Sequence, residues 1–125
     1  IYHVRIFEYN GAAAAEEYLT STGTNNPNTQ TTYAATPAGQ PSAMVFSSVT
    51  ATSMQVSFTA ASGPPSGYLA VRATGAAPTG SPVDGTTYSV GDVIGDGTVE
   101  FVGNAVTFND AGLSAATTYH YNIYS

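Results

Sequence analysis

The sequence predicts an all-β fold, a β-sandwich built mainly from residues 41–125. Short segments rich in β-branched and aromatic residues alternate apolar with polar positions, and clusters of Gly, Pro, Asp and Asn separate these segments. No long amphipathic helical pattern interrupts the series. Many short strands joined by frequent turns are typical of two antiparallel sheets packed face to face.

The sequence of the first 40 residues predicts two strands and a linker. Residues 1–9 place Tyr2, Val4 and Ile6 on one face, which predicts a half-buried strand, and residues 18–22 predict a second short strand. Residues 25–40 are Thr, Asn, Pro and Gly with almost nothing to bury. We therefore expect strands in residues 1–24, a surface linker at 25–40 and a domain at 41–125.

The sequence of residues 41–125 predicts a regular series of strands. Strands are expected at 42–49, 52–59, 68–73, 98–102, 105–109 and 117–125, with irregular structure at 74–97 and a short strand around Tyr88 and Val90. At 68–73 the parity is ambiguous, and we expect Leu69 and Val71 inward and Tyr68 and Arg72 outward. The predicted core comprises Met54, Val56, Phe58, Val106, Phe108 and Leu113, joined by Tyr119, Tyr121 and Ile123 of the last strand.

The charge balance argues against several classes of partner. The chain has two Lys and Arg residues against eight Asp and Glu, and its net charge is −6. So few cations cannot neutralise a phosphate backbone or hold an anionic bilayer, so we expect no nucleic-acid partner and no membrane insertion. Without cysteine there is no disulfide and no thiolate chemistry. The Thr-, Ser- and Gly-rich composition favours a secreted protein, and the start at Ile1 inside a strand pattern leads us to expect a natural N-terminus elsewhere.

One strand of the sequence occurs twice. Tyr2 and Tyr119, His3 and His120, and Ile6 and Ile123 correspond at a constant offset of 117 residues. This duplication indicates a window from a tandem array of similar units.

The final strand and its approach resemble a known family. Leu113–Tyr119, LSAATTY, resembles the run that leads into strand F of fibronectin type III domains, and Met54–Phe58 resembles strand B, with Phe58 where most members have Trp. Residues 82–92, PVDGTTYSVGD, with residues 117–125, resemble the fibronectin type III-like repeats of large secreted Bacteroidota proteins of the gliding and adhesion type. The resemblance implies an immunoglobulin-like β-sandwich in which the Tyr119 hydroxyl bonds to upstream backbone.

The resemblance also implies an incomplete sandwich. Residues 1–24 correspond to strands F and G of a preceding repeat, and residues 41–125 correspond to strands A to F without a strand G. The N-terminal strands can therefore complete this chain's own sandwich, as in a circular permutant, or a neighbour's by head-to-tail strand exchange. The residues expected in these assembly strands are Tyr2, Val4, Ile6, Tyr121 and Ile123.

The sequence offers few candidates for chemistry. His3 and His120 lie on the outward face of their strands, where surface packing explains them, and the adjacent Glu16 and Glu17 point apart. We predict no catalytic residue, no cofactor and no metal. Weak Ca²⁺ candidates stand in Gly-rich turns, where turn chemistry already explains them without a metal: Asp84, Asp92 and Asp96.

Several tyrosines have two interpretations. Partly exposed tyrosines can stack on sugars, whereas in a β-sandwich without Trp most tyrosines cover the core or pack against linkers. The residues concerned are Tyr9, Tyr18, Tyr33, Tyr68 and Tyr124.

These observations predict a non-enzymatic structural repeat of an extracellular surface or filament-forming protein. Its expected partners are neighbouring repeats or identical subunits, with a glycan or surface receptor as a further candidate. The alternative is an accessory, glycan-binding module of a secreted polysaccharide-degrading enzyme, and a third interpretation is an adhesin tip domain that itself recognises a receptor.

Overall fold

The protein is all-β. A computed structural model describes residues 1–125 and contains eleven strands and no helix. No helix is therefore present that is long and apolar enough to cross a bilayer. The chain divides into two compact units, unit 1 at Ile1–Ala34 and unit 2 at Ala35–Ser125, and all strand pairs in both units are antiparallel.

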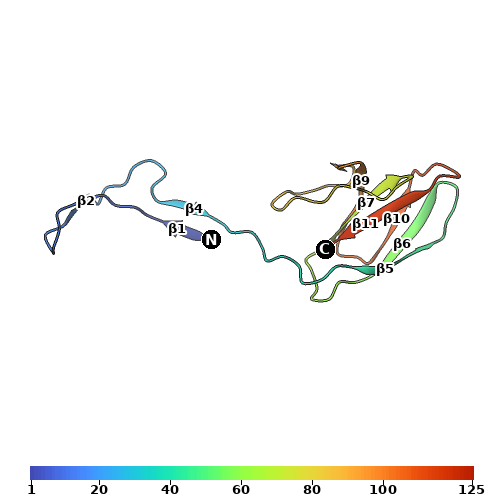
Figure 1. Ribbon diagram of the computed structural model, residues 1–125, viewed down its shortest axis with the longest axis horizontal. Helices are drawn as coiled ribbons and strands as arrows, with labels where there is room; N and C mark the ends of the chain where they lie inside the picture. Colours follow the sequence, from blue (N-terminus) through green and yellow to red (C-terminus); the bar gives the residue numbers. More distant parts are fainter. The chain divides into compact units, whose positions relative to one another are not determined.

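Unit 1 consists of two small ribbons (Figure 1). The strand β1 (Tyr2–Val4) pairs with β4 (Asn28–Gln30), and β2 (Tyr9–Asn10) pairs with β3 (Glu17–Tyr18). Every residue of these four strands is exposed. Two-stranded ribbons have no second layer to cover an apolar face, so unit 1 has little to stabilise it besides its hydrogen bonds.

Two expectations for this part of the chain are wrong. The strand at residues 1–9 is not half-buried, because the side chains of Tyr2, Val4 and Ile6 are 57–69% exposed. Residues 25–40 are not an unbroken linker, because β4 lies within them and is the partner of β1. The pairing joins segments more than twenty residues apart, and the polar sequence around β4 gives no sign of it.

Unit 2 contains a three-stranded sheet in the order β10-β6-β5. Its strands are β5 (Ser42–Ser47), β6 (Ser53–Thr59) and β10 (Thr107–Ala111). The central strand β6 alternates as expected, with Val56 and Phe58 buried. Figure 1 shows β5 and β6 side by side in unit 2.

The second sheet of unit 2 has four strands in the order β11-β7-β9-β8. They are β7 (Tyr68–Thr74), β8 (Val93–Ile94), β9 (Gly97–Gly103) and β11 (Tyr119–Tyr124). The expected strand around Tyr88 and Val90 is absent, and β8 follows a few residues later. The strand β11 stands at one edge of this sheet, with β7 as its only neighbour.

The core of unit 2 lies between the two sheets. The ring of Phe58 meets that of Tyr68 edge to face at 4.9 Å, and the ring of Phe101 stacks on that of Phe108 at 4.9 Å. Each contact joins the two sheets. Two antiparallel sheets that share one apolar core are consistent with a β-sandwich. The buried members of this cluster are Val56, Phe58, Ala61, Tyr68, Ala70, Phe108 and Tyr121.

The four-stranded sheet is also covered on its other face. Val71 and Val99 are fully buried there against Ile94 of β8, beneath the irregular residues 75–92. This cover lies very close, since a Cβ on Gly80 would approach the backbone nitrogen of Gly95 to 2.6 Å. Glycine at position 80 therefore allows the two backbones to meet.

Burial on both faces explains why the parity of residues 68–73 was predicted wrongly. Tyr68 and Arg72 point toward the core between the sheets, and Leu69 and Val71 point toward the second cluster. A strand buried on both faces has no clean alternation of apolar and polar residues, so sequence alone cannot decide its orientation.

Most of the remaining core predictions are confirmed. Val56, Phe58, Phe108 and Leu113 are buried, while Met54, Tyr119 and Ile123 are partly buried and pack against the same cluster. Val106 is the exception, because its side chain is 40% exposed. The strand β10 begins one residue later, and the carbonyl of Val106 accepts a hydrogen bond from the amide of Phe58 at 3.0 Å.

Candidate functional site

The free edge of β11 is the first candidate for a functional surface. The amide of Gly75 donates to the carbonyl of Thr118 at 3.0 Å, in continuation of the ladder between β7 and β11. Alternate residues of an antiparallel strand bond to the same neighbour. Tyr121 and Ile123 therefore direct their amides and carbonyls away from β7, to the edge that has no neighbouring strand.

A groove runs beside this edge, between β5 and β11. It contains a cavity of about 170 Å³. Nearby, Phe46 is 45% exposed and its ring packs on that of Tyr121 at a centroid distance of 5.4 Å. The groove thus joins unpaired backbone groups to exposed apolar surface, a combination that suits an added strand. Its cavity is lined by Pro41, Ser42, Ala43, Met44, Phe58 and Ile123.

The predicted tyrosine corner is confirmed in its hydrogen bond. The hydroxyl of Tyr119 accepts a hydrogen bond from the amide of Ser114 at 2.8 Å. This contact fixes the turn that leads into β11 and so positions the start of the free edge.

Removing the Tyr119 hydroxyl is expected to destabilise unit 2 modestly. Tyr119→Phe leaves the ring in place but leaves the amide of Ser114 without its acceptor, and this amide is exposed enough to bond to water. The free energy of unfolding should fall by about 1 kcal/mol, as measured by urea denaturation. An unchanged unfolding free energy would show that the corner bond contributes nothing.

A cluster of charged and polar groups connects the two sheets within the core. The guanidinium of Arg72 donates to Asp110 at 2.6 Å and lies 2.7 Å from the carboxylate of Glu100. The hydroxyl of Tyr121 donates to the second oxygen of Asp110 at 2.6 Å. Arg72 also lies over the ring of Tyr119, 5.2 Å from its centroid. Asp110 is only 3% exposed, and each of its carboxylate oxygens accepts a hydrogen bond within this cluster.

A bulge in β9 brings Glu100 into the cluster. The register between β7 and β9 shifts at this point, and Glu100 is the extra residue between Val99 and Phe101. Val99 belongs to the outer cluster and Phe101 packs against the inner one. The bulge interrupts the alternation and turns the carboxylate of Glu100 toward Arg72.

The cluster is suited to structure rather than to proton transfer. Burial and the hydrogen bond to Asp110 raise the pKa of the Tyr121 hydroxyl, so this group stays protonated. Burial likewise raises the pKa of the Glu100 carboxyl, an effect that the charge of Arg72 opposes. No member is a free base or nucleophile, because each is held by another. Sequence reasoning missed this cluster, and the only available signal was a single Arg in an otherwise Lys- and Arg-free domain.

The three Ca²⁺ candidates lie apart in separate turns. Asp96 accepts hydrogen bonds from the amide and hydroxyl of Thr79 at 2.8 and 2.9 Å, which lower the pKa of its carboxyl. Asp92 accepts from the amide of Ser89 at 2.8 Å, and Asp84 is exposed. No group of three or more His, Asp and Glu side chains is arranged to hold a metal ion. The carboxylate of Asp92 thus caps its own turn, and that of Asp96 binds Thr79 of the covering loop.

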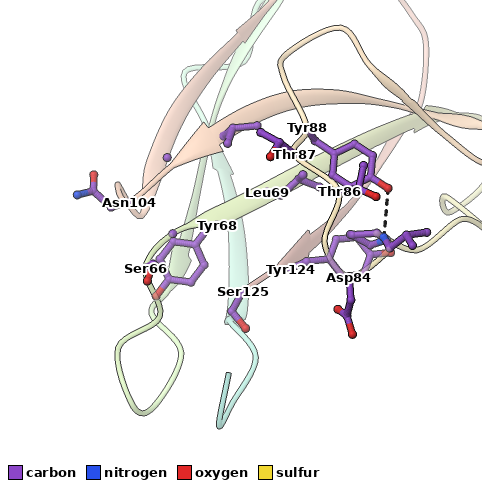
Figure 2. Close-up of a pocket in the computed structure, with 15 residues that line it drawn as sticks. Ser66, Tyr68, Leu69, Asp84, Thr86, Thr87, Tyr88, Asn104, Tyr124 and Ser125 are labelled. Atoms are coloured by element: carbon purple, nitrogen blue, oxygen red, sulfur yellow. Dashed lines mark hydrogen bonds between the residues drawn. The ribbon is translucent and has the colours of Figure 1, made fainter. Parts of the chain in front are cut away.

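A larger pocket of about 650 Å³ lies over the outer side of the four-stranded sheet (Figure 2). Tyr88 and Tyr124 line it, and both hydroxyls are engaged: that of Tyr88 accepts from the amide of Val83 at 3.1 Å, and that of Tyr124 donates to the carbonyl of Gly80 at 2.9 Å. These bonds attach the covering loop to the sheet.

The tyrosines proposed from sequence as sugar platforms have different surroundings. Tyr9, Tyr18 and Tyr33 in unit 1 are 60–75% exposed. Tyr68, by contrast, is buried, and its hydroxyl accepts a hydrogen bond from the amide of Ala61 at 3.1 Å. Its expected exposure is therefore wrong.

The two copies of the duplicated strand have different partners. β1 pairs with β4, and β11 pairs with β7, so the copies do not join one sheet. His3 is exposed on β1 and His120 is half-buried on β11, with no nucleophile bonded to either. Each copy is thus described by its pairing within its own unit.

The sequence matches no protein-family model, and no curated protein matches it.

Proposed function

We propose that this chain is a non-enzymatic structural repeat of an extracellular surface or filament-forming protein, and that copies join head to tail by strand exchange. The observation that carries the proposal is the free edge of β11 in a chain that holds a second copy of the same strand. An edge with unpaired backbone groups is a template for another strand.

The sandwich proposed here is of the fibronectin type III-like kind. The order β10-β6-β5 corresponds to strands E, B and A, and the order β11-β7-β9 corresponds to F, C and C′. The bond from Ser114 to the Tyr119 hydroxyl supports the same assignment. In this correspondence the place of strand G, next to β11, is vacant, and the repeat takes that strand from a neighbour.

Strand exchange between identical chains in one direction is a head-to-tail contact, which builds linear assemblies when its rotation does not close a ring. Light scattering of the purified chain over a wide concentration range should show a mass that increases with concentration. Electron microscopy should show linear particles. A mass that stays monomeric at every concentration would overturn the assembly.

The tyrosine-lined pocket supports a second candidate, an accessory glycan-binding module of a polysaccharide-degrading enzyme. Its size suits a sugar residue, and aromatic rings are typical of carbohydrate sites. Titration of the chain with oligosaccharides, followed through the amide signals of Tyr88 and Tyr124, tests it. Because both tyrosine hydroxyls are bonded to backbone, we favour the structural role.

A further inference from the structure

We propose that the free edge of β11 binds the segment Leu19–Thr24 of a second copy of this chain, in one defined antiparallel register. The inference rests on the proposed function and specifies its contact. Its basis is the register of the β2–β3 hairpin in unit 1, extended beyond Leu19 and transferred along the 117-residue offset to unit 2.

In unit 1 only the end of the duplicated strand bonds to the segment Leu19–Thr24, while Tyr2–Val4 pairs with β4. Tyr9 faces Tyr18 in the ribbon of β2 and β3, and the amide of Leu19 donates to the carbonyl of Glu8 at 2.9 Å. Continued in the same register, Ser21 would face Ile6. Unit 1 does not continue it, because the side chain of Asn26 bonds to both the amide and the carbonyl of Ile6, at 2.9 and 2.6 Å.

The segment beyond Leu19 is therefore available to another chain. Residues 19–24 are all exposed, and the Leu19 side chain is 56% exposed. Apart from the bond of Leu19 to Glu8, the segment's only backbone bond beyond strand pairing is that from the amide of Asn26 to the carbonyl of Gly23 at 3.1 Å. Little structure has to be lost for it to add to a sheet.

The offset defines the register on β11. Glu8, Ile6 and Val4 correspond to Ser125, Ile123 and Tyr121. Their partners in the extended register of unit 1 are Leu19, Ser21 and Gly23, so these three residues should face Ser125, Ile123 and Tyr121 respectively.

Corresponding residues of the two strand copies direct their backbone hydrogen-bonding groups to corresponding edges. In unit 1, the bond from Leu19 to Glu8 shows that these two residues form a hydrogen-bonded pair. Every second pair along the extended register would then be hydrogen-bonded as well. In unit 2, the bond from Gly75 to Thr118 leaves Tyr121 and Ile123 with their backbone groups toward the free edge. The register thus sets the bonding groups of Ser21 and Gly23 against the groups that β11 leaves unpaired. A shift of one residue would set them against groups already bonded to β7.

The side chains also suit the groove. Residues that face each other across an antiparallel pair point to the same side of the sheet, so Leu19, Ser21 and Gly23 would point inward with Tyr121 and Ile123. Phe46 already occupies the space over Tyr121, where glycine adds no side chain. Leu19, near Ile123, lies toward the 170 Å³ cavity lined by Met44 and Phe58.

The test uses the 125-residue chain, labelled with ¹⁵N, and a synthetic peptide of residues 17–24. Peptide binding should slow hydrogen exchange at the amides of Tyr121 and Ile123 by at least about tenfold, as expected for newly formed strand hydrogen bonds. The amides of His120 and Asn122, which already face β7, should change little. No slowing at Tyr121 and Ile123 with millimolar peptide would overturn the inference.

Two proline-containing peptides test the register. Ser21→Pro removes an amide that should bond to Ile123, so it should weaken binding at least about tenfold. Thr22→Pro is the matched control, because the amide of Thr22 should point away from β11, where an edge strand tolerates proline. Equal binding by both peptides would overturn the register.

The outcome is separable from that of the proposed assembly. Linear oligomers without peptide protection of Tyr121 and Ile123 would leave the structural function standing and overturn this inference. Protection in the expected pattern, with a chain that stays monomeric, would support the binding edge and overturn filament assembly.

Discussion

An Asp110→Ala chain is expected to unfold with a free energy about 3–5 kcal/mol below that of the natural sequence. Asp110 is 3% exposed and is the shared acceptor of Arg72 and Tyr121, at 2.6 Å each. Its removal leaves the guanidinium of Arg72, whose side chain is 19% exposed, with Glu100 as its only carboxylate partner. It also leaves the hydroxyl of Tyr121 buried without an acceptor. Urea denaturation followed by circular dichroism measures the effect.

Two variants separate the loss of the buried contact from the loss of a charge. Asp84→Ala removes an exposed carboxylate of the same domain and should change the free energy of unfolding by less than about 0.5 kcal/mol. Asp110→Asn keeps an acceptor oxygen for Tyr121 or Arg72 while it removes the negative charge, so it should lose less stability than Asp110→Ala. An effect of Asp110→Ala as small as that of Asp84→Ala would show that the cluster does not stabilise the sandwich.

The same cluster marks the limit of prediction from the sequence. The strand β6 is buried on one face, so the alternation of residues 53–59 was enough to predict which side chains point inward. The resemblance of the LSAATTY run was enough to predict the hydrogen bond of the Tyr119 hydroxyl. The strand β7 is buried on both faces, and polar Arg72 belongs to the inner one because Asp110 and Glu100 meet it there. Those partners come from other strands, and a register shift is needed to turn one of them inward.

The candidate site, too, could be predicted from the sequence only in part. The duplicated strand is visible in the sequence, and it is the basis for predicting Tyr121 and Ile123 as assembly residues. That β11 lacks a second neighbour follows only from the order of strands in the sheet, which depends on contacts between distant segments. The pairing of β1 with β4 also joins segments that are distant in the sequence. No hydrophobic pattern in residues 28–30 indicates a strand.

Phe58→Ala should destabilise unit 2 by about 3–5 kcal/mol, the range typical of a buried aromatic residue replaced by alanine. The side chain of Phe58 is 7% exposed and meets the ring of Tyr68 edge to face. It also lines the 170 Å³ cavity of the groove, so the new space joins an existing opening that water can enter. Because water can fill the space that the ring leaves, we expect a loss toward the lower end of this range.

Phe46→Ala is the matched control for this prediction. Phe46 lies on the neighbouring strand β5 beside the same groove, but its side chain is 45% exposed and packs mainly on Tyr121. Its removal should therefore cost clearly less, about 1 kcal/mol, since much of its surface is already in water. Urea denaturation of both variants gives the comparison. Similar losses for the two, or a loss under about 1 kcal/mol for Phe58→Ala, would place the centre of the core elsewhere than at Phe58.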